Sequence, residues 1–175
     1  LSVLPKIVEI EFAGEIGGYD NKITELCVVK GLLTAISDQP ISYVNALDVA
    51  NEHGVQIRSV TTTSSADYVN TVTIRGGGHA IAGTLVGLKG EARIVMVDDH
   101  TVDMPPSTHM IILRNDDRPG VIGKVGTALG EAGINIVDMN VGRSKDGLGA
   151  LMVISTHDSV SNDVAELLIA TDGVT

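Results

Sequence analysis

Asn115 and Asp117 are the residues whose types and spacing most favour ligand chemistry in this sequence. They stand in a polar turn between an apolar run at 109–113 and a segment at 121–132 whose apolar residues recur at helical spacing. A helix that begins after such a turn presents free backbone N–H groups, which favour an anionic group such as a carboxylate. An aspartate beside them can hold an ammonium group. The turn therefore predicts a pocket for a small amino acid; the alternative is that Asp117 only caps the helix.

The elements that must position this turn follow from the patterns around it. Pro119 suits the first position of a helix, and Gly133 suits the residue just after its end. The predicted order is strand, helix, strand, strand, helix, which is ferredoxin-like without the closing strand, so the chain is cut short there or ends in a very short edge. The predicted ranges are strand 108–114, helix 119–132, strand 135–143, turn 145–147, strand 148–156 and helix 160–170.

The first half of the sequence predicts a separate α+β domain, in which a strand and two helices precede an antiparallel meander. Its helix at 20–36 has apolar residues on more than one face and includes Cys27, for which we expect a core position. The stiff segment 105–107 contains two prolines and predicts the linker, so the expected domains are 1–104 and 108–175. The other predicted elements are strand 6–12, helix 42–53, a strand from 55, strands 68–74, 79–86 and 92–97, and a short strand at Val102.

Composition excludes several classes of function. The net charge of −10 repels phosphate backbones, and an aromatic content of 2% leaves few stacking platforms, so we expect no nucleic-acid binding. No apolar run reaches the ~20 residues that span a bilayer, so we expect no membrane partner. The histidines lack metal-ligand spacing, and the single cysteine offers no metal cluster. The chain starts at Leu1 without Met, which suggests a fragment, and we expect a cytoplasmic location.

Three motifs that resemble catalytic or nucleotide-binding sites are better explained as structure. Asp98-Asp99-His100 predicts a turn between two short strands, and Gly76-Gly77-Gly78 predicts a hairpin tip. Gly123 and Gly126 lie inside the predicted helix, so they form no dinucleotide fingerprint; with Gly130 they leave a bare stripe that favours self-association. We therefore expect no catalytic residue, no metal and no cofactor in this chain.

Residues 117–136, Asp-Arg-Pro-Gly-Val-Ile-Gly-Lys-Val-Gly-Thr-Ala-Leu-Gly-Glu-Ala-Gly-Ile-Asn-Ile, resemble the opening of an ACT domain, the small ligand-binding module of amino-acid metabolism. Among these domains the stretch is most similar to the C-terminal serine-sensing domain of the D-3-phosphoglycerate dehydrogenase family. The resemblance implies that serine is held by Asn115, Asp117 and Asn135, and that N–H groups of the turn meet its carboxylate. The implied effector site comprises Asn115, Asp117, Arg118, Pro119, Gly120, Val121, Ile122 and Asn135.

Most of residues 1–104 is similar to the intervening domain of long-form members of the same family, which is thought to bind substrate-like anions. Some members place several basic residues in that anion site. Here only Arg93 matches one of them, and Pro105 stands where an arginine is expected. Arg93 and Lys30 are the candidates for an anion site in this chain.

The resemblance implies a regulatory fragment of D-3-phosphoglycerate dehydrogenases, without activity of its own, that binds L-serine as an allosteric feedback inhibitor between subunits of a dimer or tetramer. The NAD chemistry would belong to the parent enzyme. One alternative is the β half of a bacterial L-serine dehydratase, but this chain lacks that family's Ser-Ser-Ser-His-Thr stretch. Another is an oligomerisation module without an effector, and another small amino acid remains an alternative ligand because Asn115 replaces the more usual His or Tyr.

Overall fold

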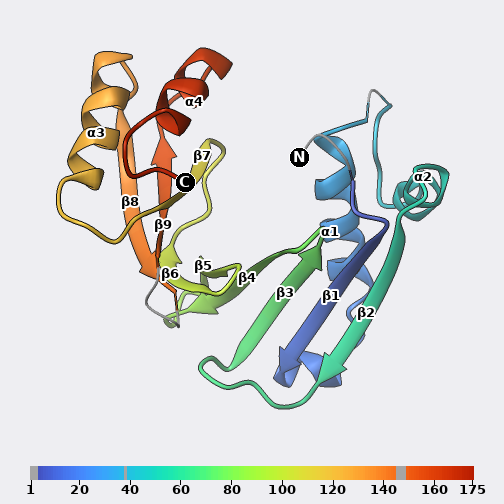
Figure 1. The fold of residues 1–175 in the computed structure, drawn as a ribbon. Helices are drawn as coiled ribbons and strands as arrows, with labels where there is room; N and C mark the ends of the chain where they lie inside the picture. The colour runs from blue at the N-terminus through green and yellow to red at the C-terminus, as the bar shows by residue number, and fades with distance from the viewer. Residues whose placement is uncertain (1–3, 38, 145–148) are drawn as a thin grey trace. The chain divides into compact units, whose positions relative to one another are not determined.

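The computed structural model describes residues 4–37, 39–144 and 149–175, which form two compact units that divide after Gly90 (Figure 1). The linker predicted at 105–107 lies within the second unit, and the division into domains 1–104 and 108–175 stays a prediction. No helix among the described residues is long and apolar enough to cross a membrane.

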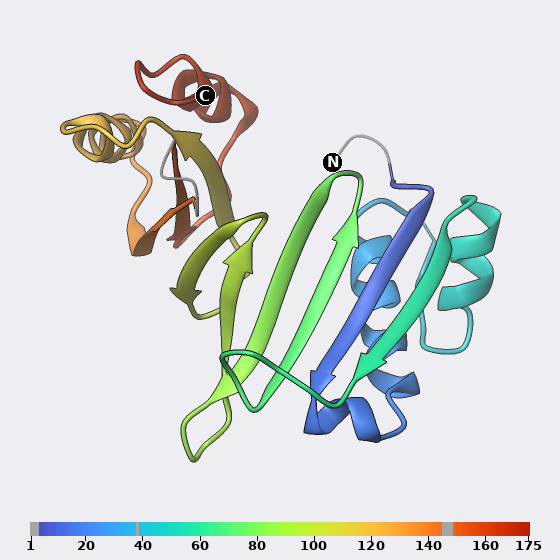
Figure 2. The same ribbon diagram turned by 60° about the horizontal axis from the view of Figure 1, so that its bottom comes forward.

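The first unit is a mixed sheet with strand order β2-β1-β3-β4, and helices α1 and α2 cover one of its faces (Figure 2). Val8, Ile10 and Phe12 alternate along β1 and are buried against Val29 and Leu33 of α1. This alternation is what the sequence pattern of the strand predicts. The elements are β1 (Ile7–Gly14), η1 (Glu15–Gly18), α1 (Lys22–Thr34), α2 (Ala46–Glu52), β2 (Gln56–Thr62), β3 (Asn70–Gly76) and β4 (His79–Val86).

Two details of the first unit differ from the sequence expectations. Strand β2 runs parallel to β1, whereas the other strand pairs of this unit are antiparallel. The two helices between β1 and β2 carry the chain back to the start of the sheet, which is the connection that a parallel pair needs. The core position expected for Cys27 is wrong: the thiol residue is exposed, because α1 turns Val29 and Leu33 toward the sheet.

The second unit contains a three-stranded antiparallel sheet with strand order β7-β9-β8, covered on one face by α3 and α4 (Figure 1). Every residue of the central strand β9 is buried. The β5–β6 hairpin belongs to this unit, and β6 runs close to β8 at Gly142, where a Cβ atom would lie 2.5 Å from the carbonyl oxygen of Thr101. The elements are β5 (Glu91–Val97), β6 (His100–Met104), β7 (Met110–Asn115), α3 (Val121–Glu131), β8 (Ile136–Arg143), β9 (Ala150–Thr156) and α4 (Asn162–Ile169).

The last residues of the given sequence pair with the end of β7, at the edge of the sheet. Val174 forms an isolated antiparallel bridge with Asn115. The N–H of Asp116 donates to the carbonyl of Gly173 at 2.8 Å, and the N–H of Thr175 donates to that of Arg114 at 2.9 Å. The turn predicted at 145–147 lies outside the described residues.

Candidate functional site

The turn between β7 and α3 places a glycine at the N-cap of α3. The helix begins at Val121, two residues later than predicted, because Gly120 occupies the N-cap with a left-handed φ of 94°. The N-cap residue itself therefore supplies no side chain to the helix N-terminus, and the alternative that Asp117 only caps the helix stays a prediction. The first N–H groups of a helix have no partner within it, and those of Val121 and Ile122 therefore stand at the turn.

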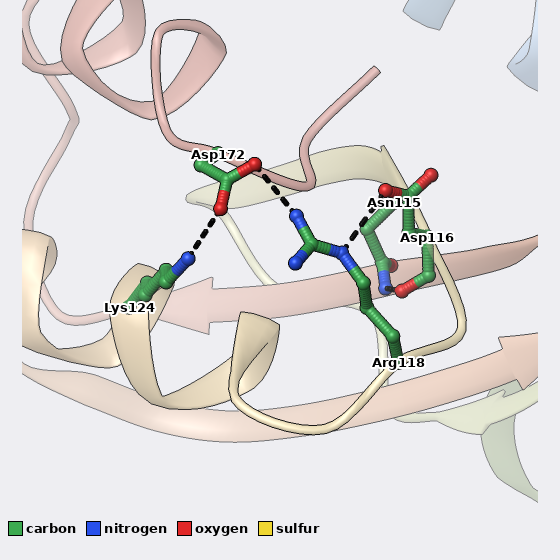
Figure 3. Close-up of polar contacts among 5 residues, drawn as sticks. All are labelled: Asn115, Asp116, Arg118, Lys124 and Asp172. Atoms are coloured by element: carbon green, nitrogen blue, oxygen red, sulfur yellow. Dashed lines mark hydrogen bonds and ion pairs between the residues drawn. The ribbon is translucent and has the colours of Figure 1, made fainter.

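Charged side chains fix the shape of this turn (Figure 3). Arg118 donates from Nη2 to Asp172 at 2.6 Å and from Nε to Asp116 at 3.2 Å. Lys124 of α3 donates to the other carboxylate oxygen of Asp172, also at 2.6 Å. Hydrogen bonds from Lys124 and then Arg118 hold the pKa of Asp172 below its usual value, and those to Asp172 and Asp116 raise the pKa of Arg118. The network ties the turn to the segment after α4.

Asn115 ends β7 with its side chain only partly satisfied. The residue is 4% exposed, and its Nδ2 donates to the carbonyl of Asp116 at 2.8 Å. The other side-chain atom, Oδ1, is buried and has no hydrogen-bond partner in the structure. A buried acceptor without a partner is costly, at about 1–3 kcal/mol, so this oxygen is a natural contact for a ligand donor or a water.

The structure does not bring Asn135 to the rest of the predicted site within one chain. Asn115 pairs with Ala150 at the start of β9, whereas Asn135 precedes Ile136, which pairs with Thr156 at the end of β9. The two asparagines are therefore separated by the length of β9, about 20 Å at ~3.3 Å per residue. Asn135 is exposed, so it is available to a second chain.

Arg93 and Lys30, the two candidates for an anion site, lie in different units, and each contacts another side chain of its own unit. Arg93 on β5 donates to the carboxylate of Asp103 at 2.7 Å, and this hydrogen bond raises its pKa. Lys30 on α1 places its ammonium 4.6 Å from the centre of the Tyr43 ring, a cation–π contact.

Sequence reasoning missed a polar pocket beside the predicted site. The pocket has a volume of about 200 Å³ and lies where the β5–β6 turn meets the end of β7. The turn predicted at Asp98-Asp99-His100 is present, with Asp98 in a left-handed conformation of φ 52°. Only the fold shows that this turn reaches Arg114, whose guanidinium pairs with Asp98. The lining residues are Asp99, His100, Arg114, Asn115, Ser144, Gly149, Ala150 and Thr175.

The other motifs that the sequence suggested as sites have structural roles among the described residues. These residues contain no group of three or more His, Cys, Asp or Glu side chains that could hold a metal ion. Gly76-Gly77-Gly78 forms the tip of the β3–β4 hairpin, as predicted. The glycines at 123, 126 and 130 lie along α3 with open space where a side chain would stand.

Comparisons with known proteins match both halves of the chain. The D-3-phosphoglycerate dehydrogenase intervening domain family matches residues 4–98, and the ACT domain family matches residues 109–173. The D-3-phosphoglycerate dehydrogenase of Mycobacterium leprae is 30% identical over 172 residues, which cover 95% of this chain and 33% of that protein. That of Archaeoglobus fulgidus is 33% identical over 173 residues, 95% of this chain and 32% of that protein. The chain spans about a third of the length of these relatives.

Proposed function

The chain belongs to the D-3-phosphoglycerate dehydrogenase family and corresponds to its regulatory region, and on that premise we propose that it binds L-serine as an allosteric feedback inhibitor between two subunits. The observation that carries the proposal is the partly satisfied Asn115 beside the glycine N-cap of α3. A carboxylate and an ammonium group separated by one carbon atom are the groups that such a turn complements.

The carboxylate and the ammonium group of L-serine each have a partner in the turn. Its carboxylate accepts hydrogen bonds from the N–H groups of Val121 and Ile122, where the helix dipole also favours negative charge. Its ammonium group lies against the carboxylate of Asp117 and the Oδ1 atom of Asn115. Arg118, Pro119 and Gly120 set the backbone path of the turn, since Gly120 takes up the left-handed conformation and Arg118 anchors the network with Asp172.

The second half of the site comes from another copy of the chain. Asn135 is about 20 Å along the sheet from Asn115, so an asparagine that contacts the ligand belongs to the partner subunit. The glycine stripe of α3 supports such an assembly, because a Cβ atom on Gly123, Gly126 or Gly130 would meet no other atom within 4 Å. Another backbone can approach this face closely. We expect a dimer, or a tetramer built from dimers.

Inhibition follows if serine fixes the relative placement of two subunits and so biases a distant active site. Coupling of this kind is typically worth ~1–3 kcal/mol between two sites. The NAD chemistry of a cytoplasmic parent enzyme takes place in other residues of the full-length protein, because the described residues do not fit a dinucleotide. Gly76-Gly77-Gly78 joins two antiparallel strands and opens no helix, and the glycines of α3 follow its start.

Calorimetric titration with L-serine tests the proposal. The parent chain is expected to bind, and Asn135→Ala to weaken binding about tenfold or more, the loss of about 1.4 kcal/mol that one good polar contact supplies. Asn51→Ala is the matched control, since Asn51 is an exposed asparagine on α2 in the other unit. Sedimentation velocity with and without L-serine measures the assembly in the same samples. Absence of heat with the parent chain would rule the proposal out.

A further inference from the structure

The pocket between the β5–β6 turn and the end of β7 has the properties of a second ligand site. Its volume of about 200 Å³ is several times the ~30 Å³ that one water molecule occupies. All of its lining residues belong to the second unit. The described part of the pocket is therefore built from one chain.

Two buried polar atoms mark this pocket as incomplete without a ligand. Among the described residues, the buried side-chain nitrogen and oxygen atoms without a hydrogen-bond partner are Nδ1 of His100 and Oδ1 of Asn115. Both residues line the pocket. The His100 side chain is 6% exposed, and its Nδ1 lies 2.8 Å from Oδ1 of Asp99 without forming a hydrogen bond with it. Native proteins leave few buried polar atoms unpaired, so two at one pocket point to a bound polar group.

Charges of both signs lie at the pocket. The guanidinium of Arg114 is half exposed and is held in place by its ion pair with Asp98, which leaves further N–H donors for a ligand. The carboxylate of Asp99 is also half exposed. Arg114 and Asn115 are consecutive in β7, so their side chains leave the sheet on opposite faces. The β5–β6 turn therefore gathers Arg114, Asp99 and His100 on one side, and Asn115 borders the pocket at the end of the strand.

We propose that this pocket binds a small α-amino acid within a single chain, separately from the site between subunits. The carboxylate of the ligand pairs with Arg114, and its ammonium group donates to Asp99. A volume of about 200 Å³ suits a ligand with a small side chain. Asn115 belongs to both sites, so occupation of one changes the surroundings of the other.

NMR spectroscopy of the ¹⁵N-labelled chain tests the proposal in the Asn135→Ala background, in which the site between subunits is weakened about tenfold or more. L-Serine and glycine are expected to shift the backbone amides of Gly149 and Ala150 and the Nε–H signal of Arg114. Acetate and methylamine each carry one of the two charged groups, and each is expected to bind at least tenfold more weakly than glycine. Equal binding of acetate and glycine would overturn the assignment to an amino acid.

Two substitutions with matched controls locate the binding. Asp99→Asn and Arg114→Gln are expected to weaken glycine binding about tenfold each, whereas Asp67→Asn and Arg58→Gln, both exposed in the other unit, leave it unchanged. Asp99 is exposed, so its variant folds even if Arg114→Gln does not. Shifts confined to Val121 and Ile122, or no shifts, would overturn this proposal. The proposed serine site is tested independently, by the weaker L-serine binding expected of Asn135→Ala.

Discussion

The two units each contain a strand that leads through a short connection into a helix, and the two connections treat their polar groups in opposite ways. One runs from β1 through η1 into α1, and the other runs from β7 through the turn into α3. Both begin at the end of a strand with a buried face, and both helices cover a sheet. The comparison separates what a connection needs for folding from what it leaves over for a ligand.

Side chains of the first unit form hydrogen bonds with the backbone of the first connection. Oδ1 of Asn70 accepts the N–H of Ile16 at 2.7 Å, and Nδ2 of Asn21 donates to the carbonyl of Ile16 at 2.8 Å. At the start of α1, the N–H of Lys22 donates to the carboxylate of Asp20 at 3.0 Å. This connection is closed by side chains, and its polar residues have a structural role.

The second connection differs in its N-cap and in its asparagine. Its N-cap is Gly120, which has no side chain, and Oδ1 of Asn115 has no partner. Charged residues of the turn bind one another and the segment after α4, which stiffens the turn. Ion pairs among its side chains can therefore hold the shape of the turn while one buried acceptor is left for a ligand.

Gly120→Ala is expected to have the largest effect on this comparison. A Cβ atom there meets no atom within 4 Å, so the cost comes from the left-handed backbone alone, about 1–2 kcal/mol of unfolding free energy. L-Serine binding should be lost as the turn rearranges. Gly31→Ala is the control, because it lies inside α1 with equally open space and should gain about 0.5–1 kcal/mol. Urea unfolding and calorimetry measure both; a Gly120→Ala chain as stable as the parent would contradict the account.

Substitution of one asparagine beside each connection tests the contrast. Asn70→Ala leaves the N–H of Ile16 without its partner and should cost about 1 kcal/mol of stability without changing L-serine binding. Asn115→Ala removes the hydrogen bond from Nδ2 to the carbonyl of Asp116, but it also removes a buried acceptor that has no partner, so its cost in stability should be smaller while binding weakens about tenfold. Equal losses of stability with no change in binding would show that the two asparagines have the same structural role.

Local patterns predicted the elements of the turn but not the groups that surround it. The alternation of β1 and the helical spacing of Val121, Val125 and Leu129 give the correct strands and helices, because each depends on neighbours within a few residues. Pro119 suits the first position of a helix, so the sequence predicts a start at residue 119. The left-handed conformation of Gly120 moves the observed start of α3 to Val121.

Contacts between distant segments were beyond the sequence patterns. Nothing near Arg114 indicates its ion pair with Asp98, since the pair forms only when the β5–β6 turn reaches the end of β7. The exposure of Cys27 likewise depends on which face α1 turns to the sheet, and a helix that is apolar on several sides gives no periodic signal for that choice. The placement of Asn135 at the far end of β9 needed the strand pairing itself.

The smallest expected effect concerns the charged network of Arg118, Lys124 and Asp172 at the second connection. Asp172 has a lowered pKa in the folded chain, so it stabilises the fold at pH values above its ordinary pKa of ~3.9, and this contribution is lost as the pH falls through the folded value. Asp172→Asn should therefore be slightly less stable than the parent at pH 7, and the difference should disappear in strong acid. Because the residue is exposed, salt should reduce the difference at pH 7.

Urea unfolding at the two pH values measures the difference in stability, with Asp67→Asn as the control for an exposed aspartate in the first unit. A difference that grew toward acid would mean that Lys124 and Arg118 do not stabilise the carboxylate, and that the second connection owes its shape to the backbone of Gly120 alone.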